Sequence, residues 1–398
     1  MLEESAALAR LLALVPPATA EVLPLEECLG RFALADYFAT LPLPSFANSA
    51  MDGYALHAAD CGPPGLPLIV SGAQPAGPDL GLAVRPGHCV RLFTGAPLPR
   101  DAAAVVMQED TLMSPDGTSI SLTEAVAPGE FIRHRGADLS VGQRLLATGQ
   151  AITPARLGLL ASQGLAALTC GVRPRAAVLT TGDELCPPGP APLAPGQIYD
   201  SNGPMLRALL QEVGCRASAH HAPDELTHIT ETAQRLLAEN DILVFVGGVS
   251  VGDHDLVKPA LAALGIPLEF WRVRLKPGKP FLFTTHQGKL IFGLPGNPVS
   301  AFVTALLFLL PACRKLAGAA AAAALPRRTP ATLCSPISNN GDRPHYLRGL
   351  YQSEDATFTP LGLQQSHALT ALAQGNALLR LDPYAAAPAG SFHPVILL

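Results

Sequence analysis

The feature that most constrains the fold is a regular alternation, after residue 175, of short strand-like runs with segments of helical character. The strand-like runs lie at 176–181, 216–221, 241–246 and 289–294. The helical segments lie at 201–213, 224–240, 254–265 and 298–310, the second of them capped by Asp224. Apolar strands separated by helices are typical of a parallel sheet that is covered on both faces. The sequence therefore predicts a parallel α/β sheet in this part of the chain.

The rest of the chain predicts a different organisation on either side of this sheet. The first forty residues have helical character, whereas residues 41–149 contain short apolar runs broken by Pro, Gly and Asp, which is typical of β structure. Residues 151–165 predict a helix with Thr153 at its N-cap. After an alanine-rich linker at 317–330, residues 331–398 predict a small β domain.

Composition limits the class of protein. The chain has 27 Lys and Arg against 32 Asp and Glu, and this net charge of -5 argues against a nucleic-acid-binding protein. Glu3 and Glu4 stand where a signal peptide would carry positive charge. The longest apolar run, 301–313, is shorter than the roughly 18 residues that cross a bilayer, and Pro311 interrupts it. The eight cysteines form no CxxC pair, so neither a disulfide framework nor a zinc site is expected. We therefore expect a cytoplasmic protein that binds neither membrane nor nucleic acid.

Glycine-rich loops follow three of the predicted strands, at the edge where α/β sheets bind their ligands. They are the segments 182–185, 247–255 and 295–298, and backbone N–H groups in such loops form a cradle for anions. The residues expected to bind an anion there are Ser201, Asn202, Gly247, Gly248, Pro295, Gly296, Asn297 and Pro298. One such loop alone is more often an ordinary tight turn, and none of them matches a Walker A loop or a dinucleotide-binding fingerprint.

Carboxylates gather in and beside the same loops. They are Asp183, Glu184, Asp200, Asp253 and Asp255. Two carboxylates 4 Å apart repel each other by about 4 kcal/mol at an effective dielectric constant near 20, so such a cluster favours a bound cation. A set of oxygen ligands suits Mg²⁺, with substrate phosphates completing its coordination shell. We expect two or three of the five to hold the ion, whereas ordinary helix capping is the better interpretation of Asp200.

The segment Lys276-Pro277-Gly278-Lys279 has the residue pattern of a type II turn, which brings the ends of the turn within about 7 Å. Two ammonium groups are thereby close together, and no neighbouring acidic residue neutralises them. Water would solvate them on an exposed turn, but beside an anion cradle a bound oxyanion or phosphate explains them better. A second polar cluster, NSAMDGYA at 48–55 with TGAP at 94–97, by itself predicts no more than a turn.

Together these segments resemble the MoeA-type molybdopterin molybdenumtransferases, the family that includes the gephyrin E domain. The resemblance covers nearly the whole chain, in the order FANSAMDGYA, FTGAPLP, TTGDEL, VGGVSVGDHDLVK, LKPGKP, GLPGNPVSA and QQSHALTALAQGNAL. The chain departs from the family pattern at Asp101 and Ala103, where glycine and aspartate are frequent, and at His254, where an aromatic residue is common. None of these departures touches the lysine pair.

The resemblance implies a multi-domain α/β plus β protein that forms a homodimer. The four expected parts are an elongated helix-containing domain (1–45 and 140–174), an inserted β domain (46–139), an α/β molybdopterin-binding domain (175–320) and a C-terminal β-barrel (327–398). The α/β domain is expected to be similar to the molybdopterin adenylyltransferases. In this family the active site combines the α/β domain of one subunit with the inserted β domain of the other, which would explain the polar segment around Asp52.

The activity implied by the resemblance is insertion of molybdate into adenylylated molybdopterin, which releases AMP and yields molybdenum cofactor with the help of Mg²⁺. Matching positions imply catalytic roles for Asp52, Thr94, Glu184, Asp255, Lys276 and Lys279. They imply binding roles for Asp138, Asp224, Ser250, Pro280, Arg348 and Ser366, of which the last four are associated with molybdate. Expected protein partners are a molybdopterin adenylyltransferase and molybdoenzyme-maturation proteins.

Three questions stay open at this point. The chain could instead be a molybdopterin adenylyltransferase that uses ATP, because the α/β part alone resembles those enzymes. It could also be a scaffold that keeps the fold without the chemistry. Molybdate and tungstate are tetrahedral dianions of nearly the same size, so the sequence is compatible with either.

Overall fold

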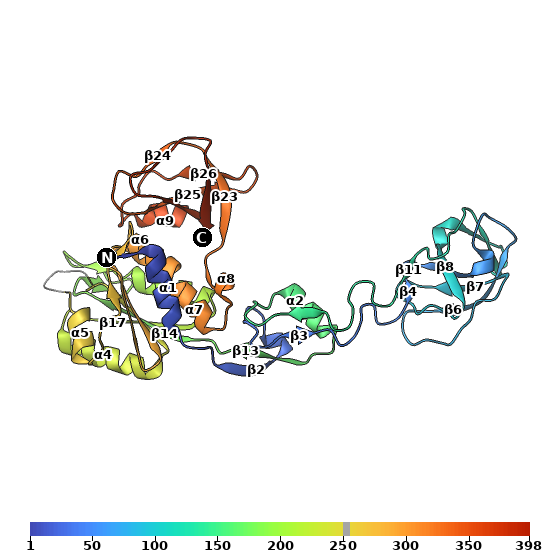
Figure 1. Cartoon of the computed structure of the whole chain (residues 1–398), viewed down its shortest axis with the longest axis horizontal. Helices are drawn as coiled ribbons and strands as arrows, with labels where there is room; N and C mark the ends of the chain where they lie inside the picture. Colours follow the sequence, from blue (N-terminus) through green and yellow to red (C-terminus); the bar gives the residue numbers. More distant parts are fainter. Residues whose placement is uncertain (250–254) are drawn as a thin grey trace. The chain divides into compact units, whose positions relative to one another are not determined.

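The computed structural model describes residues 1–249 and 255–398, which form two compact units (Figure 1). Unit 1 consists of Met1–Ala35, Ala147–Gly158 and Leu165–Leu398. Unit 2 consists of Asp36–Leu146 and Leu159–Gly164. The finer division into four domains stays a prediction.

A six-stranded sheet with the order β17-β14-β18-β22-β21-β19 forms the centre of unit 1 (Figure 1). Four neighbouring strands are parallel and confirm the predicted runs: β17 (Arg216–Ala222), β14 (Arg175–Thr181), β18 (Ile242–Val246) and β22 (Lys289–Leu294). Two further strands, β21 (Leu282–His286) and β19 (Phe270–Trp271), extend the β22 edge in antiparallel pairing. Gln287 and Gly288, between β21 and β22, have φ values of 50° and 77°, which suit a two-residue hairpin turn.

Helices cover both faces of this sheet. One face carries α4 (Leu226–Glu239) and α5 (Val257–Ala263). The other carries α1 (Glu4–Leu14), α3 (Asn202–Glu212), α6 (Pro298–Thr304) and α7 (Leu310–Leu316). Successive strand residues point to opposite faces, so Val178 packs in the core beneath α3 and Leu179 in the core beneath α4.

Two details of the predicted helices were wrong. The helix predicted from Asp224 begins at Leu226, with Glu225 in the N-cap position. Pro311 does not interrupt the apolar helix: a π-helical turn at Ala305–Leu309 leads into α7, and Pro311 is the second residue of α7. The continuous helix Pro298–Leu316 has 19 residues, and in length and apolarity it could cross a membrane, but 78% of its apolar window is buried inside the protein. It is therefore a helix of the core.

The N-terminal forty residues are helical only at their start, so the prediction of helix throughout was wrong. After α1 the chain passes two prolines, Pro16 and Pro17, and then forms β2 (Ala20–Pro24), which pairs with β13 (Ala167–Gly171). Proline restricts the backbone to extended conformations around it, which favours a strand here. The predicted helix after Thr153 is confirmed as α2 (Pro154–Ala161), and the Arg156 N–H donates to Thr153 Oγ1 at 3.4 Å.

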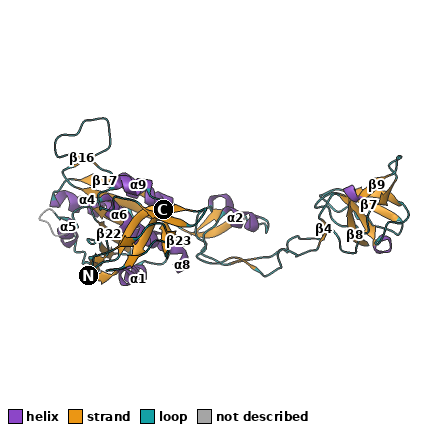
Figure 2. Cartoon of the chain, turned by 90° about the horizontal axis from the view of Figure 1, so that it is seen from above, coloured by secondary structure: helices purple, strands orange, loops and turns teal. Residues whose placement is uncertain are grey.

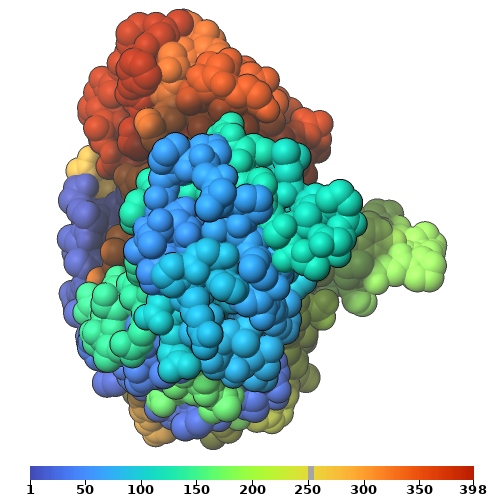
Figure 3. Space-filling view, turned by 90° about the vertical axis from the view of Figure 1, so that its right-hand side faces the viewer, coloured from blue at the N-terminus to red at the C-terminus, as the bar shows by residue number. Residues whose placement is uncertain are grey.

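Unit 2 contains a six-stranded β sheet with the order β8-β5-β7-β6-β10-β9, in agreement with the β structure predicted for 41–149; Figure 2 labels β7, β8 and β9 among its strands, drawn in orange. Its strands are β5 (Gly53–His57), β6 (Leu68–Gln74), β7 (His88–Leu92), β8 (Ala102–Met107), β9 (Thr111–Met113) and β10 (Ser119–Leu122). The unit forms one compact body, blue to teal in the space-filling view (Figure 3).

The C-terminal residues form a closed five-stranded barrel, which confirms the predicted β domain. In barrel order its strands are β23 (Arg328–Leu333), β26 (Thr357–Pro360), β25 (His345–Gln352), β27 (Ala377–Leu381) and β29 (Phe392–Leu397). A short helix, α9 (Leu369–Gln374), contacts both β25 and α6. The barrel and the α/β sheet therefore share one continuous core, in which Tyr346 and Leu378 pack with sheet residues.

A polar contact joins α1 to the barrel inside unit 1. The fully buried Tyr346 donates its hydroxyl hydrogen to Glu4 Oε1, and Arg380 Nε donates to Glu4 Oε2 at 3.0 Å. Burial, followed by the charge of Glu4, raises the pKa of Tyr346 far above its usual range, so the phenol stays protonated and donates. The Glu4 carboxylate thus connects the first helix to two barrel strands.

We expect Glu4→Gln to lower the free energy of unfolding by about 2 kcal/mol, because hydrogen bonds to a charged acceptor are worth roughly 1.5–3 kcal/mol. Calorimetric thermal unfolding would measure the change. Glu3→Gln is the matched control, since the Glu3 side chain is 60% exposed and lies 3.4 Å from Arg274 Nε. An equal effect of both substitutions would contradict the role assigned to Glu4.

Candidate active site

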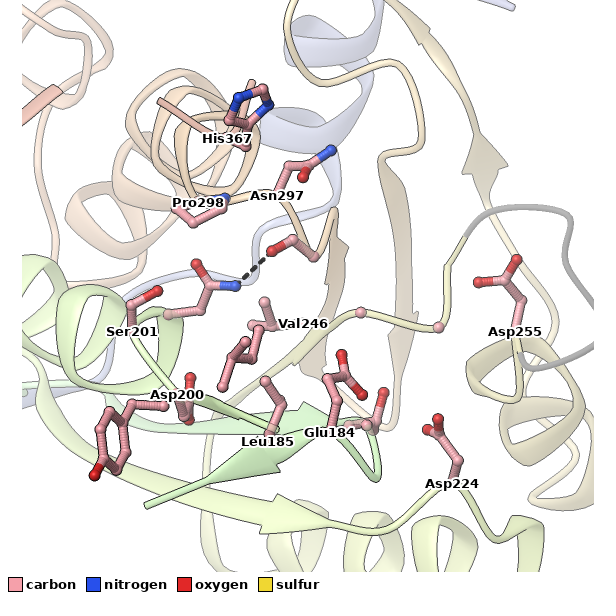
Figure 4. Close-up of a pocket in the computed structure, with 18 residues that line it drawn as sticks. Glu184, Leu185, Asp200, Ser201, Asp224, Val246, Asp255, Asn297, Pro298 and His367 are labelled. Atoms are coloured by element: carbon pink, nitrogen blue, oxygen red, sulfur yellow. Dashed lines mark hydrogen bonds between the residues drawn. The ribbon is translucent and has the colours of Figure 1, made fainter. Parts of the chain in front are cut away.

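The loops at the carboxyl ends of β14, β18 and β22 line a cavity of about 690 Å³, which we call the acidic cavity (Figure 4). Its wall includes the predicted site residues Glu184, Asp200, Ser201, Asn202, Asp224, Gly247, Gly248, Asp255, Gly296, Asn297 and Pro298. Figure 4 shows Glu184, Asp224 and Asp255 on one side of the cavity and Asn297, Pro298 and His367 on the other. The structure thus brings together the three loops that the sequence singles out.

Glycine at the loop positions allows these segments to approach one another. Gly247 and Gly248 have φ values of 89° and 59°, in the left-handed region that favours glycine. A Cβ atom on Gly247 would lie 3.0 Å from the Thr181 carbonyl oxygen, and one on Gly248 would lie 3.3 Å from Thr181 Oγ1. Glycine at these two positions therefore allows the β18 loop to pack closely against Thr181 at the end of β14, and the Gly247 N–H donates to the Leu294 carbonyl oxygen at the end of β22.

A second close approach joins the helix α3 to the loop after β22. Asn202, only 8% exposed, donates from Nδ2 to the Gly296 carbonyl oxygen at 2.7 Å. A Cβ atom on Gly296 would lie 3.7 Å from the Gly247 Cα atom. All three loops therefore meet at one edge of the sheet.

The five predicted metal carboxylates have different surroundings. Glu184 and Asp255 line the acidic cavity, whereas Asp183 is not among the described residues of its wall and accepts a hydrogen bond from the Asp224 N–H at 3.0 Å. Asp200 accepts from the Gly203 N–H at 2.9 Å and from the Thr180 hydroxyl at 3.0 Å, which is the capping role favoured for it. Asp253 lies outside the described residues.

The carboxylates of the acidic cavity can be compared with the coordination that Mg²⁺ prefers. Within residues 1–249 and 255–398, no three His, Cys, Asp or Glu side chains are close enough to form a metal site by themselves. Mg²⁺ commonly takes only one or two carboxylates and completes its shell with water and substrate phosphates. The carboxylates of Glu184, Asp224 and Asp255 on one side of the acidic cavity fit that requirement.

A neighbouring cavity of about 480 Å³, the lysine cavity, surrounds the Lys276–Pro280 segment. Its wall consists of Lys276, Pro277, Gly278, Lys279, Pro280, Pro295, Asn297, Ser300, Arg343, Gln364, Gln365, Ser366 and His367. The predicted type II turn is not formed: the Lys276–Pro277 peptide is cis, and the Lys276 carbonyl oxygen accepts from the Tyr346 N–H instead of from the Lys279 N–H. Gly278 has a φ of 121°, in the region that favours glycine. Asn297 and His367 also line the acidic cavity, so the two cavities are adjacent.

The barrel holds one wall of the lysine cavity in place. Arg348 is fully buried and donates from Nη2 to the carbonyl oxygens of Leu363 and Gln365, at 2.6 and 3.2 Å. Burial lowers the pKa of Arg348. Its guanidinium therefore fixes the segment that carries Gln364 and Ser366 into the wall.

The predicted residues of the β-rich segment lie in unit 2. The Thr94 N–H and hydroxyl both donate to Asp52 Oδ1, at 2.7 and 2.8 Å. These two hydrogen bonds, backbone first, lower the pKa of Asp52, and the charge of Arg91 lowers it further. Asp52 is therefore a carboxylate at neutral pH. Asp138, exposed, donates its backbone N–H to the Leu43 carbonyl oxygen at 2.9 Å.

Some residues of the two cavities were not among the predicted ones. His367 lines both cavities, and Arg343 and Gln364 line the lysine cavity. His367 directly follows the predicted Ser366, which was the one signal for it in the sequence. Gln364 belongs to the same QQSH segment, whereas Arg343 carried no such signal, because only the barrel fold brings it beside Lys276. Ser250, predicted to bind molybdate, lies outside the described residues.

Comparison with known protein families gives three matches along the chain. Residues 2–164 match the MoeA N-terminal region (domain I and II). Residues 177–315 match a probable molybdopterin binding domain, and residues 330–398 match the MoeA C-terminal region (domain IV).

Individual relatives cover most of the chain. The molybdopterin molybdenumtransferase of Haemophilus influenzae is 35% identical over 370 residues, which are 92% of this chain and 90% of the relative. Molybdopterin molybdenumtransferase 2 of Mycobacterium tuberculosis is 37% identical over 366 residues, 89% of each chain. The crystal structure of the molybdopterin biosynthesis MoeA protein from Pyrococcus horikoshii OT3 is similar with a TM-score of 0.84, at 26% identity and 100% coverage of both chains.

Proposed function

Since the chain belongs to the MoeA family and is a transferase of molybdenum cofactor biosynthesis, we propose that it inserts molybdate into adenylylated molybdopterin, with Mg²⁺ bound and with release of AMP. The observation that carries this proposal is that two cavities of opposite charge lie side by side. One offers carboxylates and backbone N–H groups, and the other offers Lys276, Lys279 and Arg343.

The acidic cavity suits the phosphoanhydride end of the substrate. Glu184 and Asp255 would hold Mg²⁺, which when bound polarises the phosphoanhydride for release of AMP. The N–H groups of Gly248 and of Asn202, the first residue of α3, would bind phosphate oxygens, because N–H groups in such loops and helix starts attract anions. The N–H groups of Gly247 and Gly203 already donate, to the Leu294 carbonyl oxygen and to Asp200 Oδ1. Asn202 keeps the α3 start and the Gly296 loop at a fixed separation.

The lysine cavity suits molybdate. Lys276 and Lys279 would bind the tetrahedral dianion beside the dithiolene, so that molybdenum and the two sulfur atoms are held at reacting distance. Ser366 belongs to the wall of this cavity, and the buried Arg348 holds the segment that carries Ser366. Because Asn297 and His367 belong to both cavities, one bound molecule of substrate can extend from the carboxylates to the lysines.

The test of this function is AMP release from purified protein loaded with adenylylated molybdopterin, after molybdate and Mg²⁺ are added. We expect AMP to appear only with molybdate present. Consumption of ATP with unmodified molybdopterin would instead indicate an adenylyltransferase. Tight ligand binding without AMP release would indicate the scaffold.

We also propose that the protein acts as a cytoplasmic homodimer in which Asp52 and Thr94 of one subunit serve the cavities of the other. It would receive its substrate from a molybdopterin adenylyltransferase and deliver its product to molybdoenzyme-maturation proteins.

Complementation tests the shared site. Two inactive variants, Asp52→Ala and Lys279→Ala, are expected to recover about a quarter of wild-type activity when refolded together in equal amounts, since half of the molecules are then mixed dimers with one intact site. Size-exclusion chromatography with light scattering would confirm the dimer. Mixed dimers without any recovered activity would contradict the proposal.

A further inference from the structure

His367 stands at the boundary of the two cavities, in the segment between β26 and α9. Among the described residues, His367 and Asn297 line both the acidic cavity and the lysine cavity. Figure 4 shows the ring of His367 on the same side of the acidic cavity as Asn297, across from Glu184. The amide of asparagine neither gains nor loses a proton near neutral pH. His367 is therefore the titratable residue that the two walls share within the part of the chain that the structure describes.

The backbone around His367 is held from two directions. The Ser366 carbonyl oxygen accepts from the Val299 N–H in the first turn of α6 at 3.1 Å, and the Gln365 carbonyl oxygen accepts from Arg348 Nη2 at 3.2 Å. The side chain of His367 is exposed, and its ring makes no hydrogen bond to any residue that the structure describes. The fold thus fixes the place of His367 without using its imidazole, so both ring nitrogens are available to a bound substrate.

Charged groups of both signs lie in the walls that His367 joins. Carboxylates stabilise an imidazolium, whereas cations stabilise a neutral imidazole. A ring between the two sets is therefore suited to change its charge during a reaction. The titratable residues are Glu184, Tyr199, Asp200, Asp224 and Asp255 in the wall of the acidic cavity, and Lys276, Lys279 and Arg343 in the wall of the lysine cavity.

Insertion of molybdate requires protons to move inside the lysine cavity. When a dithiol takes up molybdate, two Mo–S bonds form and one Mo–O bond breaks, and the released oxygen leaves as water with both thiol protons. Molybdenum keeps its oxidation state, so no electron donor or acceptor takes part. The ammonium and guanidinium groups of this wall donate hydrogen bonds but have no lone pair that could accept a thiol proton. Histidine is the side-chain type that both accepts and donates protons near neutral pH.

We propose that His367 is a catalytic residue that transfers the thiol protons of the dithiolene to the molybdate oxygen that leaves. The proposal rests on the proposed function, because that function places molybdate and the dithiolene in the lysine cavity. One ring nitrogen takes the proton of a thiol as its sulfur binds molybdenum, and the imidazolium then gives a proton to the departing oxygen. The ring is neutral again after each transfer, and two transfers complete one molecule of water.

Stopped-flow absorbance of the charge-transfer band between sulfur and molybdenum follows insertion in the full-length protein loaded with adenylylated molybdopterin. We expect His367→Ala to slow insertion at saturating molybdate at least about 100-fold, the usual effect of losing a general acid–base group. Added imidazole is expected to restore the rate of His367→Ala at least about tenfold, because it enters the space that the side chain leaves. His367→Gln fills that space and keeps a hydrogen-bond donor but transfers no proton. It is expected to be as slow as His367→Ala and to show no rescue.

His228→Ala is the matched control. It removes an exposed histidine from α4, and its insertion rate is expected to stay within about twofold of wild type, with or without imidazole. Isothermal titration with molybdate separates binding from proton transfer. Both His367 variants are expected to keep the affinity of the wild type within about threefold, since a group that acts only in the transition state changes the rate at saturation.

An insertion rate of His367→Gln within about threefold of wild type would overturn the proposal, as would a slow His367→Ala that imidazole does not accelerate. Loss of molybdate affinity with an unchanged rate at saturation would also overturn it, because His367 would then only bind the ion. Failure of the proposed function is distinguishable from these outcomes, since the charge-transfer band would then be missing in the wild type as well.

Discussion

Lys279→Ala is expected to reduce the rate of AMP release roughly 100-fold or more, the usual effect of removing one positioned donor from a developing negative charge. The backbone of Lys279 is held independently of its side chain, because its carbonyl oxygen accepts hydrogen bonds from the N–H groups of Val273 and Phe281 at 3.2 and 3.0 Å. The substitution therefore removes an ammonium group from the lysine cavity and leaves the loop in place.

Single-turnover AMP release at saturating and subsaturating molybdate would separate binding from chemistry. Arg235→Ala removes a cation from the exposed face of α4 and is the control for a general effect of charge, with activity expected within twofold of wild type. Lys279→Arg keeps the charge in a different shape and is expected to fall between wild type and alanine. A loss of less than threefold in Lys279→Ala would contradict the assignment of this cavity to molybdate.

Asp255→Asn is expected to raise the Mg²⁺ concentration for half-maximal activity at least tenfold and to slow AMP release roughly 100-fold, because a neutral amide is a far weaker ligand for Mg²⁺. Asp183→Asn is the matched control. Asp183 accepts a hydrogen bond from the Asp224 N–H and is not among the described residues that line the acidic cavity, so its loss is expected to change the Mg²⁺ requirement less than threefold.

The single tryptophan provides a readout that does not depend on activity. Trp271 Nε1 donates to the Val249 carbonyl oxygen at 2.8 Å, next to the Gly247–Gly248 turn of the acidic cavity. Fluorescence titration with Mg²⁺ in the presence of adenylylated molybdopterin should therefore follow ion binding. Equal shifts of the titration midpoint in Asp255→Asn and Asp183→Asn would contradict the proposed metal ligands.

The α/β part of the fold was largely predictable because a continuous apolar run in the sequence indicates a strand that is buried on both faces. The run 241–246 is apolar at every position after Asp241, as a strand covered on both faces requires, and it forms β18 at the sheet centre. The antiparallel edge was not predictable in the same way. β19 has only two residues, and its place depends on pairing with Phe283 and Leu282 of β21.

The site was predictable to the extent that it lies in loops with an unusual composition. Two pairs of residues stand out in the sequence, the glycines at 247 and 248 and the lysines at 276 and 279. Adjacent glycines cost conformational entropy on folding unless a close contact requires them. Two lysines in one short segment repel each other unless an anion lies between them. Arg343 did not stand out, since an arginine in a bend before a strand is ordinary. Only the bridge between Lys276 and His345, from distant parts of the chain, brings Arg343 beside Lys276 in the wall of the lysine cavity.

The sequence by itself determined the parallel strands, the three loops at their carboxyl ends, the two lysines and, through its motifs, the family. The tertiary structure decided that Glu4 is held by the barrel, that Asp183 stands outside the acidic cavity wall, and that two cavities share Asn297 and His367. The physical reason is that periodicity and turn residues act over a few neighbours. Hydrogen bonds such as those of Glu4 join residues more than 300 positions apart, and no local pattern encodes which of them meet.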